Sequence, residues 1–215
     1  MPAIQHELGT GVPLLPENAQ TIQLDVATGI HQTVSSSYWQ GVRIGPGERP
    51  EIVRFSRDLF AYSRLSPYEH WPAFLRRAME FFSMHLRVAR PGIAQRIGLR
   101  FINRIPMSPS LSLEDYLTSP PKDTSGLDLP ISGFLYHANF QTPNYPYAVN
   151  VSTTLQQTPD PVKQPPALIL DLDVFTVTPT SLDEKSLEGH LRRMRWLKNK
   201  VFFGSITPIL QERLQ

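Results

Sequence analysis

The segment 96–105, Arg-Ile-Gly-Leu-Arg-Phe-Ile-Asn-Arg-Ile, alternates charged and apolar residues with a period of two. Because successive side chains of a β-strand point to opposite faces of a sheet, one face receives the guanidinium groups of Arg96, Arg100 and Arg104. The other face receives apolar side chains, namely Ile97, Leu99, Phe101 and Ile105. The segment therefore predicts a half-buried strand. Its fold must supply a core for one face and water, acids or an anionic ligand for the other.

The rest of the chain repeats an order of strands followed by one long helix. Strands are predicted at 21–26, 31–44, 52–62, 131–141, 147–157 and 167–178. The turn sequence Gly45-Pro46-Gly47 separates the second and third of these strands. Two such halves predict an α+β fold, with an antiparallel sheet built from two meander halves and covered by two long amphipathic helices.

The first long helix is predicted to begin at Ser66-Pro67, with a capping box between Ser66 and Glu69, and to end before Arg90. The second is predicted at about 182–203. Short helical segments are expected at 113–117 and after Thr207-Pro208.

Composition bounds the domain organisation. The chain has 215 residues and 21 prolines, about twice the ordinary proline usage of roughly 5%. We predict a single domain, 1–215, with stiff connections. Its pseudo-halves are 18–106 and 130–215, joined by the Pro- and Ser-rich connection 107–129.

Composition also bounds the class of protein. The formal charge is +2, so attraction to a polyanion would have to be local. There is no cysteine, which excludes disulfides, thiolate metal ligands and a cysteine nucleophile. Residues 1–11 lack the basic start and apolar run of a signal peptide, and no apolar run is long enough to span a bilayer. We expect a cytoplasmic protein with no membrane partner and no cofactor.

Three stretches resemble a sporadically distributed, uncharacterised bacterial protein family of about 250 residues. They are Arg54-Phe55-Ser56-Arg57-Asp58-Leu59-Phe60, Tyr68-Glu69-His70-Trp71, and the central Gly98-Leu99-Arg100-Phe101-Ile102-Asn103-Arg104-Ile105. The ending 198–207 also looks like that family's C-terminal pattern. The resemblance implies no catalytic residues. The patchy distribution of that family suggests a role in mobile elements, toxin–antitoxin pairs or phage defence. This suggestion rests on association alone and implies no mechanism.

The arginine row has two interpretations. Guanidinium groups along a strand can meet the phosphates of an extended nucleic acid. Alternatively, they can pair across strands with Asp171 and Asp173, which share one face of the segment 167–178 and could sit opposite Arg100 and Arg104. We favour the structural pairing because the chain contains both charge rows and little net charge.

Other candidate residues lie on helices and strands elsewhere. Arg192 and Trp196 on the last long helix form a second candidate binding surface, since tryptophan beside arginine is typical of interfaces. His70 is expected to cap a helix or lie at the surface. His137 and Asn139 share a strand face and are expected to make structural hydrogen bonds.

The preferred interpretation is a non-enzymatic binding or accessory protein that acts through protein–protein contacts. Its recognition residues would be Arg96, Arg100, Arg104, Arg192 and Trp196. The alternative is a nucleic-acid-binding component that uses the arginine strand. The third is a metal-dependent hydrolase that uses the two aspartates of 167–178.

Overall fold

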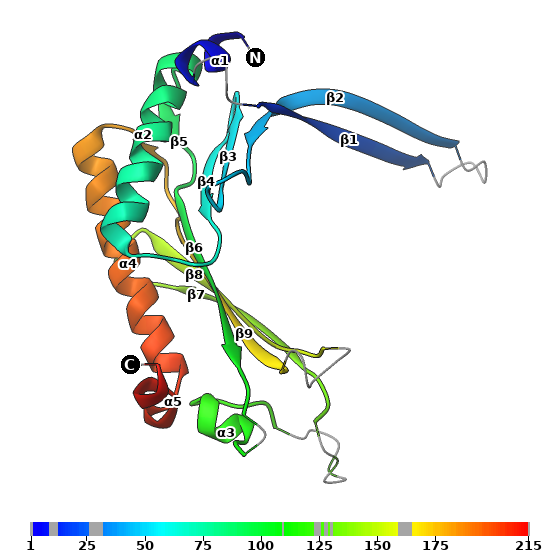
Figure 1. The fold of residues 1–215 in the computed structure, drawn as a ribbon, viewed down its shortest axis with the longest axis vertical. Helices are drawn as coiled ribbons and strands as arrows, with labels where there is room; N and C mark the ends of the chain where they lie inside the picture. The colour runs from blue at the N-terminus through cyan, green and yellow to red at the C-terminus, as the bar shows by residue number, and fades with distance from the viewer. Residues whose placement is uncertain are drawn as a thin grey trace. The chain divides into compact units, whose positions relative to one another are not determined.

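The computed structural model has an α+β fold with antiparallel sheets, and its described residues include five helices (Figure 1). The structure describes residues 2–8, 13–25, 32–108, 110–122, 126, 129, 131–158 and 165–214. The chain divides into two compact units, Met1–Pro91 and Gly92–Gln215.

The described residues of the first unit form one four-stranded sheet and two helices. Its elements are α1 (Pro2–Leu8), β1 (Leu15–Asp25), β2 (Gln32–Ile44), β3 (Glu51–Ser56), β4 (Phe60–Arg64) and α2 (Trp71–Ala89). The strands follow the order β1-β2-β3-β4, each antiparallel to its neighbour. Residues 41–44 of β2 pair with β3, whereas the rest of β2 pairs with β1 alone, so β1 and β2 extend as a two-stranded ribbon (Figure 1).

The core of the first unit lies where α2 packs against β3 and β4. Its buried members are Ile4, Val42, Val53, Phe55 and Phe81. Phe55 and Phe81 meet edge to face, with ring centroids 6.3 Å apart. Aromatic side chains from β3 and α2 thus fix the helix to the sheet.

The start of α2 differs from the sequence prediction. The helix begins at Trp71, and its N-cap is His70, whose Nδ1 accepts a hydrogen bond of 3.1 Å from the Ala73 N–H. The predicted capping box of Ser66 and Glu69 is wrong, because Glu69 instead accepts a hydrogen bond from Arg64. The expected capping role of His70 is confirmed.

The second unit holds the arginine strand. Its elements are β5 (Ile93–Ala94), β6 (Gly98–Pro106), α3 (Leu113–Tyr116), β7 (Leu135–Gln141), β8 (Tyr147–Gln156), β9 (Ala167–Thr176), β10 (Thr180–Ser181), α4 (Glu184–Ser205) and α5 (Pro208–Arg213). The four-stranded sheet has the order β6-β9-β8-β7, and β5 pairs separately with β10. β6 and β7 are therefore the two edge strands of this sheet.

The core of the second unit follows from the alternation of β9. Its residues Leu168, Leu170, Leu172 and Val174 are all fully buried. The helix α4 packs against β9 and β6, and its Met194 is also fully buried. One face of the sheet is therefore apolar and packed, while the other face carries polar side chains, as expected for an antiparallel sheet.

Several sequence predictions agree with the structure in the type of element but differ from it in bounds or in strand pairing. The strands do not join into one sheet, because hydrogen bonds within the described residues divide them into two four-stranded sheets and a two-stranded pair. The predicted strand 52–62 is interrupted at 57–59 and becomes β3 and β4. In the sequence, the boundary between the two units falls between Pro91 and Gly92, ahead of the arginine strand. The predicted helix at 113–117 is confirmed as α3, with a capping box between Ser112 and Asp115.

Candidate functional site

The candidate site is the side of the second sheet opposite α4, here called the polar face. Its side chains come from alternate positions of the four strands and from Arg96, just before β6. They include Arg96, Arg100, Ile102, Arg104, Leu135, His137, Asn139, Asn150, Ser152, Asp171 and Asp173.

Two ion pairs connect β9 to the arginine row. Arg100 donates Nε to Oδ1 of Asp171 at 2.9 Å and Nη2 to Oδ2 at 2.5 Å, which is a bidentate geometry. Arg96 donates Nη2 to Oδ2 of Asp173 at 2.6 Å. The predicted cross-strand pairing is therefore confirmed for Arg100, but the second partner is Arg96 rather than Arg104.

The pairing is diagonal because of the strand register. Arg100 lies directly opposite Asp173, and Asp171 lies opposite Ile102. A long side chain reaches the diagonal neighbour on the next strand as readily as the direct one. The Arg96 guanidinium also lies 4.3 Å from the centroid of the Phe175 ring, which helps to hold it over β9.

Amide and imidazole groups continue the network across β8 and β7. Asn139 donates to Oδ1 of Asn150 at 2.8 Å, and Asn150 in turn approaches Oδ2 of Asp173 at 3.5 Å. His137 Nδ1 lies 2.7 Å from the Ser152 hydroxyl. The structural hydrogen bonds expected for His137 and Asn139 are confirmed.

Arg104 differs from the other two arginines. Its Nε donates to Oε1 of Gln156 and its Nη2 to the carbonyl of Pro165, both at 3.1 Å. No carboxylate in the described part of the chain pairs with it. Neutral acceptors hold the guanidinium in place without cancelling its charge, so the polar face carries one excess positive charge at this corner.

The polar face is open and partly apolar. The side chain of Arg100 is 60% exposed even though it is paired, and its hydrogen bonds with Asp171 raise the pKa of the guanidinium. Ile102 is 62% exposed and Leu135 is 75% exposed. Fixed guanidinium groups beside exposed apolar side chains are suited to contact with another protein.

The structure separates Arg192 and Trp196 from the arginine row. Both are exposed on α4, which packs against the opposite, apolar face. The same helix places Nζ of Lys198 4.2 Å from the centroid of Phe101, a residue of that apolar face. Burial, reinforced by the charge of Arg195, lowers the pKa of Lys198. The two predicted binding surfaces are thus distinct.

The arrangement does not favour the hydrolase alternative. Both aspartates already bind guanidinium groups, and no group of three or more His, Asp or Glu residues within the described ranges has a metal-binding arrangement. A metal-dependent hydrolase requires several converging oxygen or nitrogen ligands. The described residues provide no such ligand cluster.

The first unit contains a buried carboxylate that sequence analysis missed. Glu51 is 8% exposed and lines a depression of about 620 Å³. Its carboxylate accepts hydrogen bonds of 3.0 Å from Nη2 of Arg77 and from the hydroxyl of Tyr62. The alternation of side chains along β3 could have indicated this burial. Glu51 falls on the same side of the strand as Val53 and Phe55, both of which are buried.

Electrostatics around Glu51 are set by opposing effects. Burial favours the protonated form, but the hydrogen bonds of Arg77 and Tyr62 and the charges of Arg77 and Arg49 outweigh it and lower the pKa of Glu51. Burial, and the hydrogen bond to the carboxylate, raise the pKa of Tyr62 to about 12. Because internal partners satisfy the Glu51 carboxylate, we assign it a structural role.

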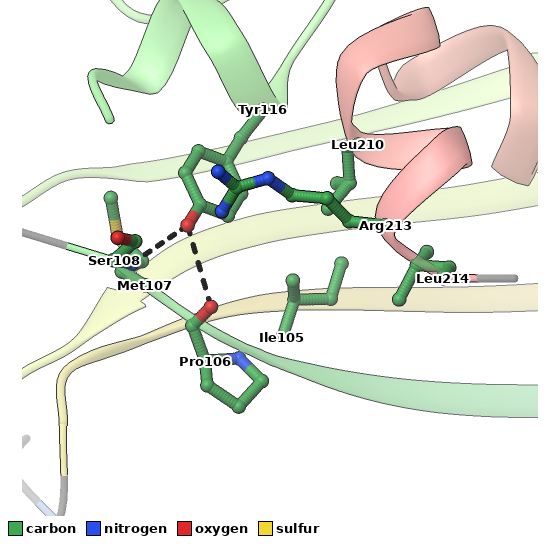
Figure 2. A pocket seen from close by; sticks show the side chains of 8 residues that line it. All are labelled: Ile105, Pro106, Met107, Ser108, Tyr116, Leu210, Arg213 and Leu214. Atoms are coloured by element: carbon green, nitrogen blue, oxygen red, sulfur yellow. Dashed lines mark hydrogen bonds between the residues drawn. The ribbon is translucent and has the colours of Figure 1, made fainter. Parts of the chain in front are cut away.

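A smaller apolar depression of about 330 Å³ lies at the end of β6 (Figure 2). The buried Tyr116 forms one wall, and its hydroxyl accepts a hydrogen bond of 2.7 Å from the Ser108 N–H. The same hydroxyl donates to the Pro106 carbonyl at 3.5 Å, and the side chain of Arg213 points across the depression toward Tyr116. These contacts attach α3 to the last residue of β6.

Comparisons with protein-family models, with curated proteins and with solved structures found no match. The resemblance to the bacterial family therefore stays a prediction. No helix in the described part of the chain is both long enough and apolar enough to cross a membrane.

Proposed function

We propose that this chain is a non-enzymatic binding or accessory protein that contacts another protein through the polar face. One observation carries the proposal. Exposed Ile102 and Leu135 lie on the same face of the sheet as guanidinium groups that hydrogen bonds hold in place. Ordered guanidinium groups lose little conformational entropy on binding, and exposed apolar side chains supply the area to be buried.

The charge distribution favours a protein over a nucleic acid. Three arginines share the face with two aspartates, which leaves a net charge of +1 (3 − 2). A phosphate backbone would be repelled by these carboxylates or would have to displace them from their arginines. A protein surface can instead place an acidic group at Arg104 alone.

The biological setting of the proposal comes from the sequence resemblance. A partner encoded beside this chain, as in a mobile-element, toxin–antitoxin or phage-defence system, fits an accessory protein in the cytoplasm. The partner would present an apolar patch with at least one carboxylate, to match Ile102 and Arg104.

The first test compares the two candidate surfaces. A protein captured from the source cells is identified, purified and titrated against this chain by calorimetry. Arg104→Glu is expected to weaken the binding of the purified partner by about tenfold or more, because it reverses the excess charge of the polar face. Arg192→Glu, on the other side of the sheet, is expected to leave the affinity unchanged. The proposal fails if no purified protein binds directly, or if only Arg192→Glu weakens binding.

The second test addresses nucleic acid. In a salt titration with single- and double-stranded DNA and RNA, we expect no steeply salt-dependent binding, because the face has little excess charge. Strong binding that falls with salt and that is reduced in Arg100→Ala would favour the nucleic-acid alternative. Measuring Arg104→Ala in parallel identifies which arginine is responsible.

A further inference from the structure

The register of β6 and β9 determines which backbone groups of β6 face outward. The Thr176 N–H donates to the Ile97 carbonyl at 3.0 Å, and the two residues occupy directly opposite positions of the antiparallel ladder. Residues of an antiparallel strand alternate between bonding to the neighbour and facing away from it. Odd-numbered residues of β6 therefore bond to β9, and even-numbered residues point their N–H and C=O groups away from the sheet.

The outward backbone groups form an open edge. They belong to Gly98, Arg100, Ile102 and Arg104, and no hydrogen bond from elsewhere in the described residues reaches them. At the far end, the hydroxyl of Tyr116 donates a hydrogen bond to the outward carbonyl of Pro106 (Figure 2). The open edge thus has a defined length, from Gly98 to Arg104, which is enough to pair with a short extended segment.

Edge strands are commonly protected from pairing by charged side chains. Here the guanidinium groups of Arg96 and Arg100 bind aspartates on β9. They are therefore held over the sheet instead of over its open edge. The backbone at Ile102 stays accessible, and its side chain is 62% exposed.

The charges beside the edge select the kind of strand that can pair with it. Arg104 lies on the polar face without a carboxylate partner among the described residues, and Lys198 lies over Phe101 on the apolar face. Both sides of the edge therefore carry positive charge. Antiparallel pairing of two copies of β6 about Ile102 would place Arg100 opposite Arg104 of the second copy, and like charges directly opposite are destabilising.

The other edge of the sheet lacks these features. Thr142 N–H donates to the Tyr147 carbonyl, so even-numbered residues of β7 bond to β8 and odd-numbered ones face outward. No lysine or arginine occurs in β7, whose sequence is Leu-Tyr-His-Ala-Asn-Phe-Gln. An acidic segment has a charge-complementary site at β6 but none on the strand β7.

We propose that the open edge of β6 takes up an extended, acidic segment of the partner protein by strand addition. The inference rests on the proposed function and specifies its partner. In this mode, main-chain hydrogen bonds supply affinity and alternate side chains supply specificity. The added strand would place a carboxylate beside Arg104 and an apolar side chain beside Ile102.

The probe is a labelled seven-residue peptide, Glu-Thr-Val-Thr-Glu-Thr-Val, in which glutamate and valine take turns along one face of the strand. Its control has lysine in place of glutamate. Fluorescence anisotropy at low salt is expected to show saturable binding of the glutamate peptide only. Ile102→Pro removes an outward N–H and no bond to β9, so an edge strand tolerates it. It is expected to weaken binding tenfold or more.

Gln141→Pro is the matched control, since it removes an outward N–H from the opposite edge. It is expected to leave peptide binding unchanged, and circular dichroism of both variants should match the parent. The inference is overturned if the parent does not bind the glutamate peptide, if both peptides bind alike, or if Ile102→Pro binds like the parent.

The same variants separate this inference from the proposed function. Ile102→Ala removes the same side chain but keeps the outward N–H. If the purified partner binds Ile102→Ala and Ile102→Pro equally but binds Arg104→Glu weakly, the polar face is used without strand addition. The strand-addition proposal then fails and the proposed function stands. If the partner loses more affinity for Ile102→Pro than for Ile102→Ala but retains it for Gln141→Pro, both are supported.

Discussion

Replacing Leu170 with alanine is expected to destabilise the second unit by about 3 kcal/mol, while replacing the adjacent Asp171 with alanine is expected to cost less than about 1 kcal/mol. Leu170 is fully buried in the central strand β9, so its removal leaves a cavity in the packed face. Asp171 lies on the polar face, and its partner Arg100 is exposed enough to be hydrated once the carboxylate is gone.

The measurement needs a signal from the second unit alone. Of the three tryptophans, only Trp196 belongs to that unit, so changing Trp39 and Trp71 to phenylalanine leaves a single reporter on α4. Urea unfolding at pH 7, followed by the fluorescence of Trp196, gives the free energy of unfolding of the Leu170 and Asp171 variants. Equal costs for the two substitutions would contradict the separation of a packed face and a polar face on which the proposed function depends.

The alternation of β6 and β9 was predictable because it depends only on local sequence. A period of two assigns each residue to a face whatever the neighbouring strand is. The choice of ion-pair partners was not predictable, because it depends on register between segments about 70 positions apart. The diagonal contact of Arg100 with Asp171 follows from that register.

The same distinction explains the two misplaced features of the first half of the chain. The sequence Ser66-Pro67-Tyr68-Glu69 satisfies a local capping pattern, but Glu69 has a competing partner, Arg64, on β4. The predicted strand 52–62 has the apolar content of one strand. Asp58 and the Ser56 hydroxyl form a local hydrogen-bonded turn instead, and this turn divides it.

The open edge of β6 could be recognised only from the structure. The arginine row was visible in the sequence, but its open edge results from the position of β6 at the end of the strand order. Sequence alone places β6 next to no particular strand. Once the order is known, the outward backbone groups and the cations beside them identify a surface for an extended acidic segment.

Arg77→Met is expected to destabilise the first unit by about 2 kcal/mol at pH 7, because it leaves the buried Glu51 carboxylate with one fewer charged partner. The Glu80→Ala control removes only the exposed partner of Arg77 and is expected to cost less than about 1 kcal/mol. Trp71, at the start of α2, reports on this unit when Trp39 and Trp196 are changed to phenylalanine.

The cost of Arg77→Met should decrease as the pH falls. In the folded protein the pKa of Glu51 lies below its ordinary value, so the unfolded chain binds a proton first and the carboxylate stabilises the fold above about pH 4.3. That contribution disappears as the pH falls through the folded-state pKa. In Arg77→Met, burial still favours the protonated carboxyl and its strongest opposing partner is gone. The pKa of Glu51 is therefore expected to rise relative to the parent, so that protonation relieves the defect. Urea unfolding at pH 7 and pH 3.5 measures both effects, and a cost that did not change with pH would show that Arg77 acts through its packing on Phe81 rather than through the carboxylate.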